Sequence, residues 1–186
     1  MQVPGRHNIL NALAATVAGL ELGIPFAKIA EGLAAFEGVG RRMEFKGERD
    51  GVRIIDDYGH HPTEIRATLS ALRDRYPKNR LVVLFQPHRY SRTQSLWNEF
   101  SQCFDQAECV YILDIYPAGE APIPGVTSEL ILEPLKKTHK AAFALPNPVE
   151  PAKLFQDLKA GDIVVTLGAG DVWKIGEQLL EANVSR

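Results

Sequence analysis

The sequence predicts an α/β fold in which a doubly wound, mainly parallel sheet carries helices on both faces. After residue 43, apolar runs of strand length alternate with helical patterns about every twenty to thirty residues, as in doubly wound sheets. One run, residues 81–85 (LVVLF), is apolar throughout, which is typical of a central parallel strand covered on both faces. Hydrophobic residues make up 45% of the 186 residues and charged residues 24%, the composition of an ordinary soluble globular protein.

Charge and composition exclude several classes of protein. The formal net charge of −2 predicts no broad basic surface for nucleic acid, and no apolar run reaches membrane length, so neither partner is expected. Cys103 and Cys109 are too few for a disulfide framework and have no neighbouring histidine, so we expect core residues in a cytoplasmic protein. The chain starts at Met1 without a strand before its first helical pattern, which suggests a piece of a longer protein.

The first two elements are predicted to be helices, over residues 6–22 and 26–36. The first carries an apolar stripe at helical spacing, and this face needs a partner to cover it. The stripe consists of Ile9, Leu10, Leu13, Val17 and Leu20. Asn8 and Asn11 lie three residues apart near the helix start, next to His7. They could cap the helix or present amide groups to a ligand, and the spacing by itself favours capping.

A glycine-bounded segment, residues 38–44, marks the predicted domain boundary. We therefore assign residues 1–38 to one unit and residues 39–186 to another. Arg41 and Arg42 are adjacent in this segment. Their charges could be solvated, or they could reach a phosphate that lies between two domains.

The remaining elements begin with two strands around Asp50-Gly51, a typical two-residue hairpin turn. Helices and strands then alternate. The predicted strands are 43–49, 52–57, 81–85, 109–113, 141–144 and 162–167, and the predicted helices are 62–75, 93–105, 127–137, 151–158 and 172–182. Residues 114–125 are rich in proline and glycine, which predicts a loop.

Three polar turns follow three of the predicted strands, at residues 56–64, 86–93 and 168–171. Carboxyl ends of parallel strands meet at one edge of a sheet, and ligands of open α/β sheets bind in the crevice outside that edge. We therefore expect the three turns to converge on one site.

The turn at residues 86–93 predicts an anion site. Arg89 and Arg92 lie three residues apart at a helix start, beside His88, and arginine grips carboxylates and phosphates with two hydrogen bonds. Cations are unfavourable at a helix N-terminus, so this placement needs an anion. The alternative is a surface cluster of ion pairs.

The turn at residues 56–64 supplies hydrogen-bonding groups and a possible base. Asp57 could accept hydrogen bonds from ribose hydroxyls, and Tyr58, His60 and His61 supply donors and a base. The two histidines could instead bind a metal ion. Consecutive residues rarely ligate one ion, however, and no third ligand has a suitable spacing, so no metal site is predicted.

Glycines mark the third turn, Gly168-Ala169-Gly170. Its backbone N–H groups could face an anion, or the glycines could simply permit a tight connection. The full dinucleotide-binding glycine pattern is missing, and the sequence contains no Gly-x-x-x-x-Gly-Lys-Ser/Thr phosphate loop. If the protein uses ATP, another region must hold most of the phosphate.

Three runs of the sequence together resemble the alanine-adding branch of the Mur ligases, the UDP-N-acetylmuramate–L-alanine ligases. They are GRHNILNA at 5–12, DDYGHHPTE at 56–64 and QPHRYSRT at 86–93. The His-Asn-x-x-Asn and Arg-Arg-Met-Glu elements are shared across Mur ligases, whereas the second and third runs are specific to this branch. The related ligase that recycles murein peptides is the alternative, but it is expected to differ at 86–93.

The resemblance implies a three-domain enzyme of which this chain is the C-terminal portion. Residues 1–38 would be the tail of the central ATP-binding domain, and residues 39–186 the Rossmann-like domain that binds the amino acid. The implied reaction is ATP-dependent amide formation through an acyl phosphate, in the synthesis of a peptidoglycan precursor. ATP and Mg²⁺ would be held mainly by the rest of the central domain, so the chain alone is expected to be inactive.

The resemblance also implies roles for individual residues. Those along the nucleotide would be His7, Asn8, Asn11, Arg42 and Asp57. Those of the L-alanine site would be Tyr58, His60, His88, Arg89 and Arg92. His60 would also help to deprotonate the incoming ammonium. Two other hypotheses stay open: a stand-alone module that binds an anion or nucleotide, and a metal-dependent hydrolase that uses His60 and His61.

Overall fold

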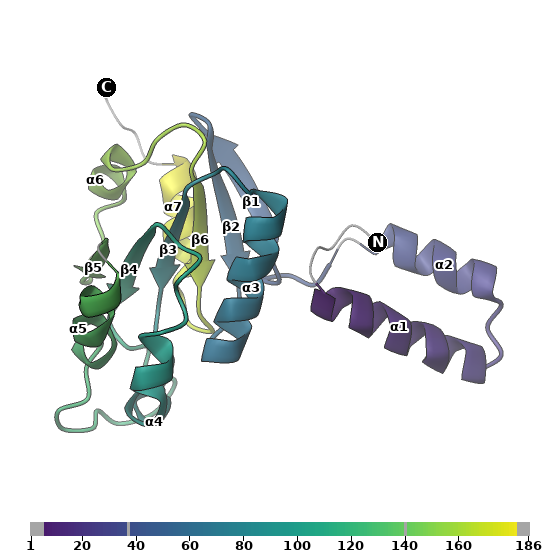
Figure 1. Ribbon diagram of the computed structural model, residues 1–186, viewed down its shortest axis with the longest axis horizontal. Coiled ribbons are helices and arrows are strands. Elements are labelled where there is room, and N and C mark those ends of the chain that lie inside the picture. The colour runs from purple at the N-terminus through teal and green to yellow at the C-terminus, as the bar shows by residue number, and fades with distance from the viewer. Residues whose placement is uncertain (1–5, 37, 140, 182–186) are drawn as a thin grey trace.

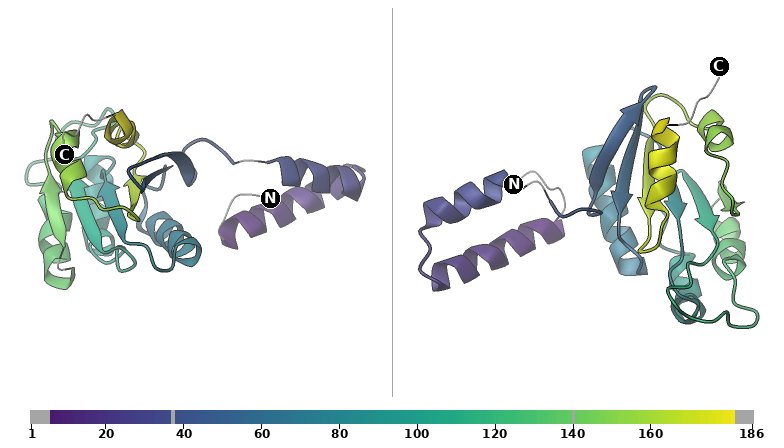
Figure 2. Two further views of the ribbon diagram at one scale, coloured as in Figure 1. Left: turned by 90° about the horizontal axis from the view of Figure 1, so that it is seen from above. Right: turned by 180° about the vertical axis from the view of Figure 1, so that it is seen from behind.

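A pair of helices precedes the sheet. The computed structural model of the chain describes residues 6–36, 38–139 and 141–181. Helices α1 (Arg6–Glu21) and α2 (Phe26–Ala35) lie side by side and extend away from the sheet in every view (Figures 1 and 2). They confirm the two predicted helices. Assigning residues 1–38 and 39–186 to different domains stays a prediction.

The helix pair exposes most of its apolar side chains. Val17 is 59% exposed and Leu13 57% exposed, although both belong to the apolar stripe. The exposed set comprises Ile9, Leu10, Leu13, Val17, Leu20, Leu22, Ile24, Phe26 and Phe36. This is the face for which the sequence predicts a covering partner.

The sheet begins with the predicted hairpin. Strands β1 (Glu44–Arg49) and β2 (Val52–Asp57) pair antiparallel, with an irregularity between Phe45 and Gly47. Asp50 and Gly51 both have positive φ, 49° and 78°, which is the backbone that two-residue hairpin turns require. The hairpin places β1 at one edge of the sheet and buries β2.

The other strands are parallel and bring the three polar turns to one edge. They are β3 (Leu81–Phe85), β4 (Cys109–Leu113), β5 (Ala142–Leu145) and β6 (Ile163–Leu167). The strand order is β1-β2-β6-β3-β4-β5. Leu167 of β6 pairs with Asp57 of β2 on one side and with Phe85 of β3 on the other. These strands therefore end level, and the predicted convergence of the turns is confirmed.

Helices cover both faces of the sheet, which confirms the predicted fold class (Figure 1). The helices are α3 (Pro62–Arg75), α4 (Tyr90–Phe100), α5 (Glu129–Thr138), α6 (Pro151–Gln156) and α7 (Trp173–Glu181). Leu69, Phe100 and Ile131 carry α3, α4 and α5 into one core. Phe155 and Leu179 carry α6 and α7 into the core on the opposite face. None of the described helices combines the length and apolar character needed to span a bilayer.

One helix differs clearly from the prediction. Helix α4 begins at Tyr90, not at residue 93, and ends at Phe100, not at residue 105. Its start is set by Arg89, which precedes it with a positive φ of 73°, and by Glu120, whose carboxylate accepts the Ser91 N–H at 3.0 Å. The carboxylate comes from a distant loop, so local sequence could not reveal it. All other described bounds lie within two residues of the predicted ones.

The turn that follows α4 explains why Cys103 is buried. After Phe100 the chain continues in single turns, with the Cys103 N–H bonded to the Phe100 carbonyl at 3.3 Å. This turn places Cys103 in the core, and Cys109 is equally buried in β4. Burial raises the pKa of Cys103 to about 12 and also raises that of Cys109, so both remain thiols. The predicted core role of both residues is confirmed.

Candidate active site

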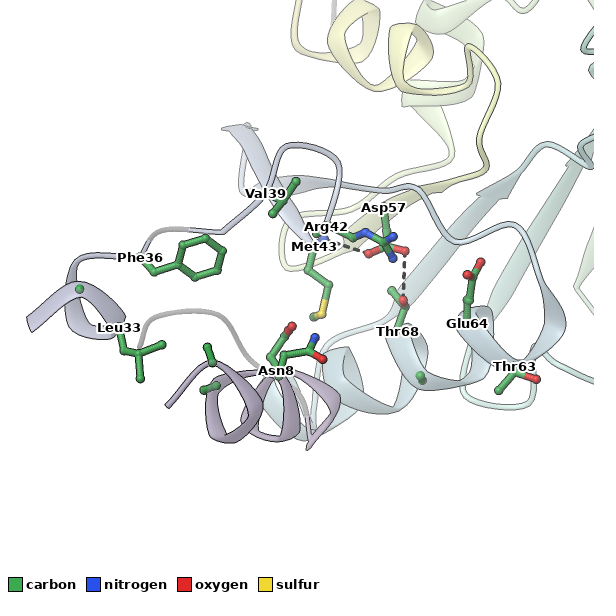
Figure 3. Close-up of a pocket in the computed structure, with 15 residues that line it drawn as sticks. Asn8, Leu33, Phe36, Val39, Arg42, Met43, Asp57, Thr63, Glu64 and Thr68 are labelled. Carbon is green, nitrogen blue, oxygen red and sulfur yellow. Dashed lines mark hydrogen bonds between the residues drawn. The ribbon is translucent and has the colours of Figure 1, made fainter. Parts of the chain in front are cut away.

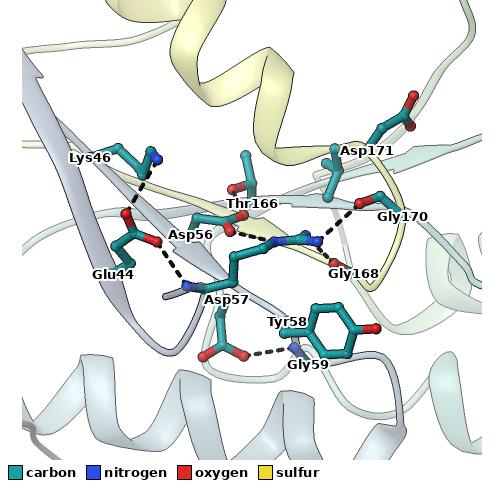
Figure 4. Close-up of polar contacts among 12 residues, drawn as sticks. Glu44, Lys46, Asp56, Asp57, Tyr58, Gly59, Thr166, Gly168, Gly170 and Asp171 are labelled. Atoms are coloured by element: carbon teal, nitrogen blue, oxygen red, sulfur yellow. Dashed lines mark hydrogen bonds and ion pairs between the residues drawn. The ribbon is translucent and has the colours of Figure 1, made fainter. Parts of the chain in front are cut away.

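The guanidinium of Arg41 ties the ends of two strands together. Figure 4 shows its partners Asp56, Gly168 and Gly170. Its Nε donates to Asp56 at 2.9 Å, and its two terminal nitrogens donate to the carbonyls of Gly168 at 2.6 Å and Gly170 at 3.1 Å. It also lies over the Tyr58 ring, 5.0 Å from the centroid. Asp56 is buried and accepts a second hydrogen bond from Thr166. Arg41 therefore fixes the turn after β2 against the turn after β6.

Asp57 organises the turn after β2. Its carboxylate accepts hydrogen bonds from Met43 N at 2.9 Å, Gly59 N at 2.8 Å and Thr68 Oγ1 at 3.1 Å. Burial raises the pKa of Asp57, although these hydrogen bonds act to lower it. Two carboxylate oxygens offer about four acceptor positions, so three internal bonds leave about one for a ligand.

Glu64 and His61 cap helix α3. The Glu64 carboxylate accepts the N–H groups of His60 at 2.9 Å and His61 at 3.1 Å, while His61 Nδ1 accepts Thr63 N at 3.3 Å. Burial acts to raise the pKa of Glu64, but these N–H donors outweigh it and the pKa lies below its ordinary value. This capping box holds the His-His-Pro turn in place.

The rings of Tyr58, His60 and His88 form a connected row. Tyr58 and His60 meet edge to face with centroids 5.3 Å apart, and His60 and His88 lie 5.8 Å apart. His60 Nδ1 lies 2.9 Å from the Tyr58 carbonyl. A carbonyl only accepts, so Nδ1 carries the proton in neutral His60 and Nε2 is left as an acceptor.

His88 has the opposite tautomer. Arg92 Nη1 lies 3.3 Å from His88 Nδ1, and guanidinium only donates, so Nδ1 accepts and Nε2 carries the proton. Burial lowers the pKa of His88 to about 4, helped by the positive charges of Arg92, His60 and Arg89. His88 is therefore neutral near pH 7. Its ring stacks on Tyr116, with centroids 5.7 Å apart and planes 10° apart.

The glycine turn after β6 is closed by protein groups. Gln86 Oε1 accepts the N–H groups of Asp171 at 2.9 Å and Val172 at 3.1 Å. The carbonyls of Gly168 and Gly170 are used by Arg41. A Cβ atom at residue 170 would lie 2.7 Å from Tyr116 Cγ, so glycine permits the close approach. The N–H groups of Asp171 and Val172 therefore face Gln86, and the Gly168 N–H donates to the Asp57 carbonyl at 3.2 Å, as the tight-connection interpretation predicts.

A pocket of about 660 Å³ lies between the helix pair and α3 (Figure 3). Asn8, Asn11, Arg42 and Asp57, four of the predicted nucleotide-site residues, all line it. Its other walls are mainly apolar, from Ala12, Ala15, Leu33, Phe36, Val39, Met43 and Ala67, with Gly32, Thr63, Glu64 and Thr68. The volume lies within the range of ordinary small-molecule sites.

The predicted residues thus fall into two adjacent groups, one in the pocket and one in the row of rings. Asp57 and Tyr58 are consecutive and join the two groups. Arg89 was predicted to belong to the L-alanine site with Arg92. Among the described residues, it differs from Arg92 in having a carboxylate partner, since its guanidinium lies 4.0 Å from the Glu120 carboxylate. Asn8 lies inside α1, not at its cap. The side chain of His7 lies outside the described part of the structure.

Sequence reasoning missed three residues that shape the site, Gln86, Tyr116 and Glu120. It considered Arg41 only as a solvated charge or a phosphate contact, whereas the structure bonds Arg41 to Asp56 and two glycine carbonyls. Arg41 had a weak signal, because it stands beside Arg42 in the linker. The signal for Gln86 was its position at the start of a polar turn. Tyr116 and Glu120 belong to a segment that its proline and glycine content marks only as a loop.

A family model decides the identity of this fold and site. The model described as the Mur ligase, glutamate ligase domain matches residues 41–170. The chain belongs to the Mur ligase family. The matched region of this Mur ligase chain contains the row of rings, both arginines of the second turn and the glycine turn.

Similar proteins of known name support the same placement. The UDP-N-acetylmuramate–L-alanine ligase of Bdellovibrio bacteriovorus is 57% identical over 180 residues, which cover 97% of this chain and 40% of that protein. The enzyme of the same name from Trichlorobacter lovleyi is 52% identical over 181 residues, covering 96% and 40%. This Mur ligase chain therefore spans about 40% of the length of these curated relatives.

Solved structures agree on the fold. The UDP-N-acetylmuramate–alanine ligase of Thermotoga maritima has a TM-score of 0.78 at 28% identity, over 96% of this chain and 38% of that one. A murein peptide ligase of Psychrobacter arcticus has a TM-score of 0.65 at 25% identity, over 95% and 37%.

Proposed function

We propose that the chain is the amino-acid-binding C-terminal portion of an ATP-dependent ligase that joins L-alanine to UDP-N-acetylmuramate. The observation that carries this proposal is the set of three groups presented by His60, His88 and Arg92. An open cation, a neutral N–H donor and a free ring nitrogen lie together at the carboxyl edge of the sheet. A small zwitterion offers the complementary groups, a carboxylate and an ammonium.

Arg92 supplies the cation for the carboxylate. Its guanidinium contacts His88 only through neutral acceptors, Nδ1 at 3.3 Å and the carbonyl at 3.4 Å, so its charge is not neutralised there. The Nε2–H of His88 adds a neutral donor. Charge-assisted bonds of this kind are among the strongest that fix a small ligand.

His60 supplies the acceptor for the ammonium. Its free Nε2 can take a proton from the amine, and Tyr58 and Glu64 hold the ring by its other nitrogen. The amine of L-alanine must lose a proton before it attacks an acyl phosphate. The new C–N bond then forms as the C–O bond to phosphate breaks. These residues would bind and orient the nucleophile, which is how positioning accelerates such a step.

The pocket between the helix pair and α3 fits a nucleotide. Its apolar walls suit an adenine ring, the amides of Asn8 and Asn11 offer donors and acceptors, and Arg42 offers a cation beside Asp57. ATP would supply the phosphoryl group that activates the carboxylate. Mg²⁺ would be held mainly by the rest of the ATP-binding domain, as the resemblance implies. The proposal places residues 1–38 with the rest of an ATP-binding domain in the cytoplasm.

The alanine-adding reaction is favoured over murein-peptide recycling. The relatives that are 49% to 57% identical carry the name UDP-N-acetylmuramate–L-alanine ligase. The structural likeness is also stronger to the alanine ligase than to the murein peptide ligase. The 186 residues alone are proposed to be inactive, because the predicted phosphate-binding region lies elsewhere.

A chimera tests the proposal. This chain replaces the matching 180 residues of the Bdellovibrio bacteriovorus ligase, and phosphate release is measured with ATP, UDP-N-acetylmuramate and L-alanine. We expect alanine-dependent release, and an increase of about 10- to 100-fold in the KM for alanine in Arg92→Ala. Arg66→Ala is the control, since Arg66 lies on α3 and its guanidinium donates to the Gln102 carbonyl at 3.2 Å, away from the rings of His60 and His88.

Two results would contradict the proposal. An intact, folded chimera that releases no phosphate with alanine, while the parent ligase does, removes the assigned reaction. An unchanged KM for alanine in Arg92→Ala removes Arg92 from the amino-acid site.

A further inference from the structure

The loop at residues 114–125 is fastened to the amino-acid side of the site at two points. At the first, Tyr116 N donates to the Pro87 carbonyl at 2.8 Å and the Tyr116 carbonyl accepts Arg89 N at 2.9 Å, while the Tyr116 ring stacks on His88. At the second, the Glu120 carboxylate accepts Ser91 N at 3.0 Å and Ser91 Oγ at 2.6 Å. The loop therefore forms a fixed part of the site wall.

Glu120 places a negative charge at the start of helix α4. A helix N-terminus favours an anion, and the sequence predicts that this helix start binds one. The hydrogen bonds from Ser91 hold the pKa of Glu120 below its ordinary value, so the side chain is ionised at neutral pH. The protein itself thus supplies the anion, and the Arg89 guanidinium lies 4.0 Å from it.

The two arginines of this turn consequently differ. Arg89 faces an internal carboxylate, whereas the structure gives Arg92 no carboxylate partner within residues 6–36, 38–139 and 141–181. One open cation matches one carboxylate. A second carboxylate on the ligand would meet the fixed charge of Glu120 in place of a free Arg89.

We infer that Glu120 is a specificity-determining residue that makes the site accept a monocarboxylic amino acid and reject a dicarboxylic one. Its carboxylate neutralises Arg89 and the α4 N-terminus, which would otherwise form a second anion subsite. Like charges brought together against a competing ligand are a common source of discrimination. This inference rests on the proposed function, because it takes the amino-acid site as given.

NMR titration of the full chain tests the inference, with the side-chain N–H signals of Arg89 and Arg92 as probes. In the wild-type chain, L-alanine is expected to shift Arg92, and L-aspartate to bind more weakly. Glu120→Gln removes the charge and keeps the side-chain shape, so the affinity for L-aspartate relative to L-alanine is expected to rise about tenfold. Glu120→Asp keeps the charge and is expected to keep most of the discrimination.

Glu133→Gln is the matched control. Glu133 is an exposed glutamate of α5 that pairs with Lys136 at 2.8 Å, and its substitution is expected to leave both affinities unchanged. The inference is overturned if Glu120→Gln leaves the aspartate-to-alanine ratio at the wild-type value, because a purely structural role would alter stability without altering that ratio.

Acetate and succinate separate this inference from the proposed function, since they carry one and two carboxylates without an amine. If the wild-type chain does not respond to L-alanine, the proposed function fails. The role of Glu120 is then tested by the affinity for succinate relative to acetate. A higher ratio in Glu120→Gln than in the wild type supports the inference, and an unchanged ratio overturns it.

Discussion

Removal of the Arg41 guanidinium is expected to destabilise the sheet edge strongly. Arg41→Ala deletes three hydrogen bonds and leaves Asp56, which is 1% exposed, with Thr166 as its remaining side-chain partner. Breaking a buried ion pair from one side typically costs about 3–5 kcal/mol. The Arg41 side chain is 25% exposed, so water can partly solvate the orphaned carboxylate. We therefore expect a loss of about 2–3 kcal/mol in the free energy of unfolding.

Thermal unfolding followed by circular dichroism measures this loss. A domain of this size shifts by about 2–4 °C per kcal/mol, so the midpoint is expected to fall by about 5–10 °C. Arg41→Lys keeps the charge beside Asp56 but cannot reach both glycine carbonyls, so about half of the loss is expected.

Arg53→Ala is the matched control, because Arg53 lies in β2 and makes a solvent-exposed pair with Glu48 at 2.7 Å. Exposed pairs contribute little, so its midpoint is expected to stay within about 2 °C of the wild type. If Arg41→Ala unfolds at the same temperature as Arg53→Ala, the guanidinium does not hold the two turns together and the reasoning fails.

Two further predictions follow from the same edge of the sheet. Folding holds the pKa of His88 at about 4 instead of the ordinary 6.5, so the unfolded chain takes up a proton first and stability falls as the pH drops from about 6.5 to about 4. His88→Asn is expected to flatten that part of a stability–pH profile measured by urea unfolding, and an unchanged slope would contradict the assignment. Gln86→Ala leaves the N–H groups of Asp171 and Val172, the second of them buried, without their acceptor, so a loss of about 1–3 kcal/mol is expected in the same assay. Gln102→Ala, at an exposed glutamine, is the control, and equal losses in both variants would exclude the role given to Gln86.

Local sequence patterns were sufficient to predict the sheet, the hairpin turn between β1 and β2, and the turn that leads into helix α3. The continuous run Leu81–Phe85 and the alternation around it determine a parallel sheet, and level strand ends follow once β6 inserts between β2 and β3. Helix α3 starts as predicted because Pro62 and the capping residues His61 and Glu64 are close in sequence. These features depend on neighbours within a few residues, which is the range that periodicity and capping rules cover.

Contacts between distant segments could not be predicted. The Arg41 guanidinium reaches Gly168, 127 residues away, through a backbone with a positive φ of 59°. Glu120 caps a helix from a loop 29 residues further along the chain. Both contacts depend on how irregular segments fold back onto the sheet edge. The periodicity of hydrophobic residues carries no information about the path of such segments. The composition of residues 114–125 predicts a loop but does not say what the loop contacts.

The most direct test of the amino-acid site is the protonation state of its two histidines, measured by ¹⁵N NMR of the imidazole rings. The chain has five histidines, so single substitutions can assign every ring. We predict that neutral His60 carries its proton on Nδ1 and His88 on Nε2, and that L-alanine shifts both rings and the Arg92 side chain more than D-alanine does. Reversed tautomers, or rings that respond identically to the two enantiomers or to neither, would contradict it.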